Sequence, residues 1–179
     1  RLSVTAAAAN LGITIEGTLP LIQPQATAKG LKLVDSVSGS ASDAHYWGDE
    51  ERVRQILVNV IGNAVKFTPS GGRITISAGA TQKPPGGAQL GGAGPWLYVR
   101  VEDTGPGIPA ERLEAVFEPF GQADLSHVRQ QGGAGLGLSI SRRLARLMGG
   151  DLTVQSEAAP GSSFVLWLPA APTEDSFTS

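Results

Sequence analysis

The strongest hydrophobic pattern in the chain predicts an amphipathic helix over residues 49–67. Apolar side chains recur there at helical spacing and would form one buried stripe: Val53, Leu57, Val60, Ile61 and Ala64. Asp49 suits the first turn of such a helix, and the sequence TPSGG at 68–72 predicts its end. A second helix is expected over 136–148, where two glycines would stop it.

Shorter alternating or β-branched segments predict the strands. They are expected at 11–15, 31–35, 73–78, 96–102, 151–156 and 163–168. A helix near 18–29 would join the first two strands, and Pro109 would open a short helix that runs to about Val116. Residues 81–95 are rich in Gly and Pro and lack periodicity, which predicts a flexible loop between paired strands.

This order of elements is typical of a two-layer α/β sandwich of the α+β class. Strands follow one another directly within 73–102 and within 151–168, which indicates antiparallel pairs rather than a continuous βαβ alternation. We expect a mixed, mostly antiparallel sheet of about five strands with about three helices on one face. Residues 1–169 would form one domain, and residues 170–179 a polar tail or linker.

Composition narrows the classes of function. The 179 residues are 41% hydrophobic and carry a formal net charge of −2 without a run of Lys or Arg, so a nucleic-acid partner is not expected. The chain has no cysteine, which excludes disulfides and thiol nucleophiles and fits a cytoplasmic protein. No apolar stretch approaches the ~20 residues of a membrane span, so no membrane contact is expected. The first residue is Arg1, so we treat the chain as a fragment, with anchoring of the parent protein in the inner membrane left open.

Polar residues form a narrow stripe beside the apolar face of the 49–67 helix. They are Arg52, Gln55, Asn59, Asn63 and Lys66. Solvated helix surfaces favour Glu, Lys and Arg, whereas two Asn residues four apart weaken a helix slightly. An Asn oxygen can bind Mg²⁺, and a Lys one turn away can meet a phosphate. The stripe alone still favours an ordinary solvated surface modestly.

The segment DTGPGIP at 103–109 follows a predicted strand and contains two glycines and two prolines. Asp103 is either an ordinary turn residue or a carboxylate that accepts a hydrogen bond from an exocyclic amine. Gly105 and Gly107 would let the backbone approach a flat base because they lack a Cβ, and the prolines would stiffen the segment. The segment by itself supports both interpretations about equally.

A glycine-rich run at 132–138, GGAGLGL, leads directly into the second predicted helix. Free N–H groups at such a helix start bind anions, although a flexible loop is the alternative. The spacing is not that of a P-loop, which needs a following Lys-Ser or Lys-Thr, nor that of a Rossmann fingerprint.

Five segments occur together in a characteristic order over about residues 20–169. They are QILVNVIGNAVKFTPSGG, VEDTGPGIP, VFEPFGQAD, GGAGLGLSISRRLARLMGG and GSSFVLWLP. In this order they resemble the N, G1, F, G2 and G3 boxes of the ATP-binding catalytic domain of sensor histidine kinases. The resemblance implies a Bergerat-type ATP-binding fold, shared with DNA gyrase, heat-shock chaperone and mismatch-repair ATPases, and it implies ATP and Mg²⁺ as cofactors.

The resemblance also assigns roles to single residues. Asn63 matches the Mg²⁺ ligand, Asn59 lies along the phosphates, and Lys66 matches a phosphate contact. Phe67 matches an aromatic residue beside the base, and Asp103 matches the acid that accepts the adenine amino group.

Further nucleotide contacts follow from the G1, F and G2 boxes. They are assigned to Gly105, Gly107, Ile108, Phe120, Gly133, Ala134, Gly135, Leu136, Gly137 and Leu138. Ala134 replaces a common Thr, a change that should be tolerated. Arg129 stands where many members place a lid arginine near the γ-phosphate, so Asn63, Lys66 and Arg129 are the candidate catalytic residues. Phe117 accompanies Phe120 in the F box, where at least one of the two would be plain core.

The phosphoacceptor of the family, a His followed by an acid on a dimerisation helix, has no match here. His45 and His127 are the only histidines, and neither has an acidic residue after it. The resemblance therefore implies a protein-histidine kinase domain whose partners are a separate dimerisation and phosphoacceptor domain of the same protein and the receiver domain of a response regulator.

Two alternatives remain. One is a nucleotide-sensing pseudokinase module, which intact Asn63, Lys66 and lid glycines disfavour. The other is a related-fold ATPase or serine kinase, which is disfavoured by the F box and by Gln55, since no water-activating glutamate stands four residues before Asn59.

Overall fold

The computed structural model describes residues 2–92, 94–118, 137–156 and 161–172. Within them a five-stranded sheet has the strand order β2-β4-β5-β7-β6. Its strands are β2 (Lys32–Asp35), β4 (Arg73–Thr81), β5 (Trp96–Asp103), β6 (Asp151–Gln155) and β7 (Ser162–Pro169). Only β2 and β4 are parallel, and the other three neighbouring pairs are antiparallel. The predicted mixed, mostly antiparallel sheet is confirmed.

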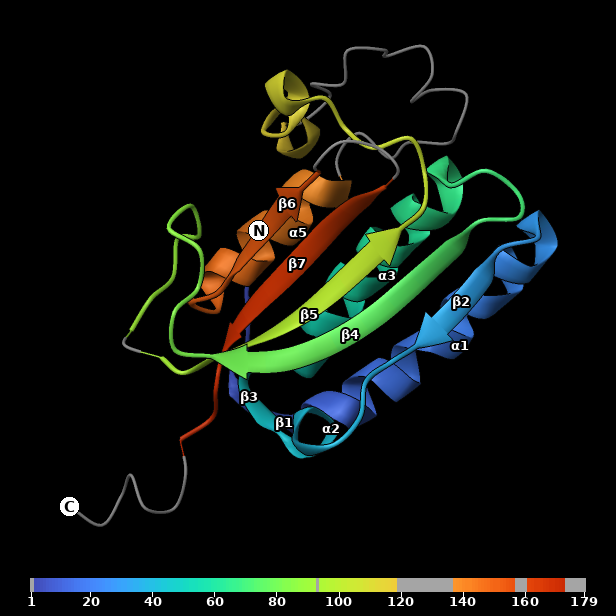
Figure 1. Ribbon diagram of the computed structural model, residues 1–179. Coiled ribbons are helices and arrows are strands. Elements are labelled where there is room, and N and C mark those ends of the chain that lie inside the picture. Colours follow the sequence, from blue (N-terminus) through green and yellow to red (C-terminus); the bar gives the residue numbers. More distant parts are fainter. Residues whose placement is uncertain (1, 93, 119–136, 157–160, 173–179) are drawn as a thin grey trace.

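Three helices cover one face of this sheet (Figure 1): α1 (Leu11–Lys29), α3 (Glu50–Phe67) and α5 (Gly137–Leu147). The middle helix, α3, contacts both α1 and α5. The core lies between the two layers, where Ile74 and Ile76 of β4 and Val99 of β5 pack with the buried side chains of the helices. The predicted two-layer α+β sandwich is therefore confirmed.

The first strand expected from the sequence is wrong, because residues 11–15 form the beginning of α1. Asn10 caps the helix, and its side chain accepts a hydrogen bond of 2.8 Å from the backbone N of Ile13. Side chains at helical spacing are then buried along α1: Leu11, Thr14, Ile15, Thr18, Ile22 and Ala26. The apolar β-branched run imitates a strand locally, but the N-cap and the burial pattern favour a helix.

A strand just before α1 forms a second, two-stranded sheet. It is β1 (Ala7–Asn10), which pairs antiparallel with β3 (His45–Gly48), and the short helix α2 (Ser40–Asp43) lies between β2 and β3. Tyr46 of β3 is fully buried and forms a β-bridge with Ala170 just beyond β7. This bridge joins the small sheet to the large one.

The α3 helix begins as the sequence predicts. Asp49 is its N-cap, with Oδ1 accepting from the backbone N of Arg52 at 3.3 Å, and the helix ends at Phe67. Its apolar face is buried: Val53, Ile56, Leu57, Val60, Ile61, Ala64 and Val65.

The segment after β5 is tighter than expected. In place of one short helix over 109–116, the chain forms two 3₁₀ turns, η1 (Ala110–Arg112) and η2 (Ala115–Phe117). The helix expected from residue 136 is α5, and 81–95 joins β4 to β5 as predicted.

The described part of the 81–95 loop is anchored to the sheet rather than free. The backbone N of Gly91 donates to the carbonyl of Gly149 at 3.0 Å. Ala88 and Leu90 pack against a second apolar cluster, which consists of Trp96, Val165 and Trp167. Among the described helices, none is long and apolar enough to cross a membrane.

Candidate functional site

The polar stripe of α3 divides into two parts. At its start, Arg52 donates to the carbonyl of Ser3 at 3.2 Å and to Oε1 of Gln55 at 3.0 Å, so these two side chains serve the N-terminal segment. Farther along, Asn59, Asn63 and Lys66 are half-buried. The structure gives the side chains of Asn63 and Lys66 no hydrogen bond or ion pair with any described residue. The second part of the stripe is therefore available to a ligand.

Asp103 stands at the end of β5 with both carboxylate oxygens held. Oδ1 accepts from the backbone N of Gly105 at 2.8 Å, and Oδ2 accepts from Oγ of Ser162 at 2.8 Å. The side chain is half-buried. Each carboxylate oxygen has a further lone pair, so Asp103 can accept another hydrogen bond from an amine in a fixed direction.

Gly105 brings the turn after β5 against the end of α3. A Cβ built on Gly105 would lie 3.3 Å from the carbonyl oxygen of Phe67 and 3.0 Å from Oδ1 of Asp103. A side chain would have to push the turn away from the helix. The Phe67 ring, 43% exposed, lies at this same end of α3.

The Gly107–Ile108 segment is attached to the residues between β6 and β7. Gly107 has φ of +79°, a value that favours glycine. The backbone N of Ile108 donates to Oγ of Ser156 at 2.8 Å, and this hydroxyl donates to the carbonyl of Gly161 at 3.1 Å. The turn after β5 and the end of β6 are thereby tied to the start of β7.

Gly161 and Ser162 contact Asp103, and the sequence reasoning did not single them out. A Cβ on Gly161 would lie 2.2 Å from the carbonyl oxygen of Asp103, so only glycine fits there. Ser162 pairs with Asp103 across β5 and β7. These residues belong to the segment GSSFVLWLP, but their contact with Asp103 depends on the register of β5 and β7, which has no local sequence signal.

The start of α5 completes the site. Nδ2 of Asn59 donates to Oγ of Ser141 at 3.1 Å, and a Cβ on Gly137 would lie 3.7 Å from Oδ1 of Asn59. Leu138 is buried in the core, so a contact between this residue and a nucleotide would come from its backbone. The other assigned residues lie outside the described residues: Phe120, Arg129, Gly133, Ala134, Gly135 and Leu136.

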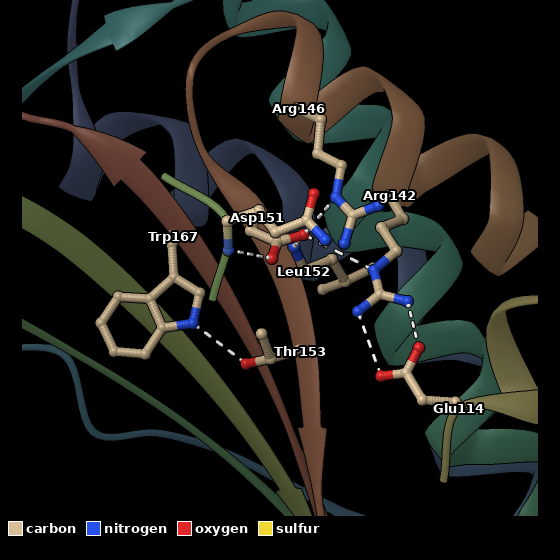
Figure 2. Close-up of polar contacts among 8 residues, drawn as sticks. Glu114, Arg142, Arg146, Asp151, Leu152, Thr153 and Trp167 are labelled. Atoms are coloured by element: carbon tan, nitrogen blue, oxygen red, sulfur yellow. Dashed lines mark hydrogen bonds and ion pairs between the residues drawn. The ribbon is translucent and has the colours of Figure 1, made fainter. Parts of the chain in front are cut away.

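A charged cluster fixes α5 to the segment before the F box (Figure 2). Arg142 forms an ion pair with Glu114 at 2.9 Å. Its guanidinium carbon also lies over the Phe117 ring, 4.0 Å from the ring centre. Asp151 is fully buried, and its Oδ1 forms ion pairs with Nε of Arg146 at 2.9 Å and with Nε of Arg142 at 3.5 Å (Figure 2). The hydrogen bond from Arg142 lowers the pKa of Glu114 below its ordinary value of 4.5.

Phe117 has the core role that one F-box residue was expected to have. It is buried and meets Phe164 edge to face, with ring centres 6.1 Å apart. Through Phe117 and Arg142, the 3₁₀ turns after the site are attached to both β7 and α5.

The donors present suit a nucleotide with its metal ion. Asn63 offers a neutral oxygen and Lys66 a positive charge, while the described residues contain no group of three or more His, Cys, Asp or Glu that could hold a metal. An Asn oxygen together with phosphates and water is a ligand set that Mg²⁺ commonly takes. Thr68, beside Gly105, has a fully buried Oγ1 without a hydrogen-bond partner, as expected where a ligand or water is part of the site.

Comparisons with known proteins point to the same chemistry. The family model described as "Histidine kinase-, DNA gyrase B-, and HSP90-like ATPase" matches residues 48–172. The autoinducer 2 sensor kinase/phosphatase LuxQ of Vibrio vulnificus (strain YJ016) is 42% identical over 127 residues, which cover 71% of this chain and 14% of the relative. Sensor protein GacS of Pseudomonas syringae pv. syringae is 41% identical over 155 residues, which cover 87% of this chain and 16% of the relative. The chain thus spans only a small part of these relatives.

Solved structures agree with the fold. Full-length ShkA in complex with AMPPNP superposes with a TM-score of 0.75 and 32% identity, over 96% of this chain and 32% of that one. The catalytic domain of the histidine kinase ThkA superposes with a TM-score of 0.74 and 24% identity, over 94% of this chain and 99% of that one.

Proposed function

Since this chain belongs to the histidine kinase-, DNA gyrase B-, and HSP90-like ATPase family and is the ATP-binding catalytic domain of a sensor histidine kinase in two-component signalling, we propose that it binds Mg-ATP and passes the γ-phosphoryl group to a histidine outside this chain. The acceptor would be on a dimerisation domain of the parent protein, and a response regulator receiver domain would take the phosphoryl group next. We place the domain in the cytoplasm and assign it to residues 1–169, with 170–179 as a tail or linker.

The observation that carries this proposal is that two segments far apart in the sequence, the turn after β5 and the start of α5, both contact α3. The turn after β5 touches the end of the helix at Phe67, where Gly105 leaves no room for a side chain. The start of α5 touches the middle of the helix at Asn59. The segment of Asp103, the Asn and Lys side chains of α3 and the start of α5 are thereby brought together along one helix.

At the base end, Asp103 accepts the hydrogen bond from the adenine amino group. Gly105 and Ser162 hold its two oxygens, so the carboxylate is oriented before the nucleotide arrives. Preorganisation of this kind reduces the ordering that binding would otherwise require. Gly107 and Ile108 present backbone to the base, and Phe67 offers an apolar ring.

At the phosphate end, Asn63 ligates Mg²⁺ while Lys66 and Asn59 contact phosphate oxygens. Bound Mg-ATP supplies the phosphoryl group to be transferred and the metal charge that offsets the phosphates. The N–H groups at the start of α5, at Gly137 and Leu138, add anion contacts. These residues position the nucleotide and offset the negative charge of its phosphates. Positioning and charge neutralisation are most of what a protein contributes to phosphoryl transfer. The same role is proposed for Arg129 and the lid positions Gly133 to Leu136, and a contact with the nucleotide for Phe120.

We expect the nucleophile to come from outside this chain. His45 lies on β3 beside Ala171, at the end of the sheet where β5 begins, while Asp103 stands at the other end of that eight-residue strand. At the rise of an extended chain, the two ends of β5 are roughly 23 Å apart. A His45 attack on a nucleotide held at Asp103 is therefore not expected.

Incubation with radiolabelled ATP tests the proposal. The isolated chain should bind ATP and form no acid-labile phosphoprotein, and addition of the parent protein's dimerisation domain should give label on that domain. Strong label on the isolated chain, lost in a His45→Ala or His127→Ala variant, would contradict the proposal. ATP binding without transfer to the supplied acceptor would favour a pseudokinase.

A further inference from the structure

Ser141 is a buried polar residue to which the proposed function assigns no role. It lies one turn after Gly137 on α5, and its side chain is fully buried. A serine is a poorer helix former than an alanine, and a buried hydroxyl costs free energy unless it is hydrogen-bonded. Among the described residues, its hydroxyl oxygen accepts a hydrogen bond of 3.1 Å from Nδ2 of Asn59 on α3. The contact with Asn59 is what a serine supplies here that an alanine does not.

This contact sets the orientation of the Asn59 amide. The terminal torsion of an Asn side chain is broad, so an unrestrained amide samples many orientations. Donation of one N–H to Ser141 fixes the amide plane and leaves Oδ1 beside Gly137. A Cβ built on Gly137 would lie 3.7 Å from this oxygen. No described residue donates a hydrogen bond to this oxygen. Oδ1 and the second N–H of Asn59 are left for a ligand at the start of α5.

We propose that Ser141 is a positioning residue, which holds the Asn59 amide in the orientation that meets the phosphates of ATP or the water bound to their Mg²⁺. This inference rests on the proposed function of the site. Ser141 itself touches no nucleotide and acts through Asn59 alone. Its influence should therefore be confined to ligands that carry phosphates.

The test is nucleotide binding by Ser141→Ala. The affinity for ATP with Mg²⁺ should fall about threefold to tenfold, the range of one net hydrogen bond. The affinity for adenosine, titrated by NMR, should change by less than about twofold. Thr18→Val is the matched control, because it removes a fully buried hydroxyl on α1, where Oγ1 donates to the carbonyl of Thr14 at 2.8 Å. This control should leave the ATP affinity unchanged.

A double-mutant cycle on ATP affinity decides whether Ser141 acts through Asn59. Ser141→Ala should weaken ATP binding in the wild-type background and have no further effect in Asn59→Ala, because the side chain that it orients is gone. Equal losses for ATP and adenosine, additive losses in the cycle, or no loss at all would each overturn the inference. Failure of the wild-type protein to bind ATP would instead overturn the proposed function of the site, so the two failures are distinguishable.

Discussion

At the scale of single residues, Asp103 is a carboxylate with both oxygens held before a nucleotide is bound. In Asp103→Asn, one oxygen becomes an amide NH₂, which cannot accept from Gly105 or Ser162 and would face the adenine amine as a second donor. ATP affinity should fall by about 1.5–3 kcal/mol, the size of a hydrogen bond to a charged group. Calorimetric titration checks this.

The neighbouring acid offers a control for Asp103. Glu102 is 48% exposed and pairs only loosely with Arg100, at 3.7 Å. Glu102→Gln should therefore leave ATP affinity unchanged. Equal affinity in wild type and Asp103→Asn, with unchanged melting, would remove Asp103 from the adenine role.

Asn63→Ala probes the metal end of the same site. Because the described residues leave the Asn63 side chain without a partner, its removal should cost little stability. It should weaken the binding of a fluorescent ATP analogue more in the presence of Mg²⁺ than in its absence, by about tenfold, the size of one lost contact to a charged group. An equal loss in both conditions would indicate damage to the fold.

How much of the site can be predicted from sequence depends on the distance over which each contact is formed. Asp103 and Gly105 act within three residues, and the Asn59–Asn63 spacing follows from helix geometry, so sequence reasoning finds them. Ser162 reaches Asp103 only through the register of β5 and β7, and Ser141 reaches Asn59 only through the packing of two helices. Neither contact has a local signal.

At the scale of elements, two glycines of α1 should respond oppositely to the same substitution. A Cβ on Gly12 would lie 2.4 Å from the backbone oxygen of Ser42, whereas one on Gly17 would meet only the Arg54 side chain at 3.7 Å. Gly17→Ala should stabilise the fold by about 0.5–1 kcal/mol through helix propensity. Gly12→Ala should destabilise it by about 1–3 kcal/mol, because α1 and α2 must separate.

Urea unfolding of both variants measures these changes. A stabilised Gly12→Ala protein would show that α2 moves aside at little cost. A destabilised Gly17→Ala protein would contradict the packing found at Arg54.

The elements themselves follow from sequence where pattern and packing agree. In α3 the apolar period, the Asp49 cap and the terminating glycines all indicate the same helix, and its bounds are confirmed. In α1 the residues 11–15 have a strand-like composition, and the helix is decided by the Asn10 cap and by burial against α3. Local propensity fails there because tertiary contacts outweigh it.

At the scale of the whole molecule, the ionisation of Tyr46 should lower the free energy of unfolding as the pH rises above 10. Burial raises its pKa from 10.0 to about 12, and its OH lies 2.8 Å from Oγ1 of Thr14. The unfolded state loses this proton first as pH rises above 10. The stabilising contribution is therefore complete below pH 10 and is lost as pH rises through about 12.

Urea unfolding at pH 9 and pH 11 measures this effect. The free energy of unfolding of the wild type should fall by about 1.4 kcal/mol more than that of Tyr46→Phe over this interval, because one pH unit above 10 is included. Parallel losses in the two proteins would mean that Tyr46 ionises as readily in the folded state.

The N-terminal segment is anchored to the beginning of α3. Thr5 donates its backbone N to Oδ2 of Asp49 at 2.9 Å, and Arg52 holds the carbonyl of Ser3, so two bonds join this segment to the first turn of α3. Tension applied to residues 2–5 would load that turn directly. A helix transmits force along its axis, and at the rise of an α-helix Asn63 lies roughly 21 Å along that axis from Asp49. A force on the N-terminal segment would thus act on the same helix that carries Asn59, Asn63 and Lys66.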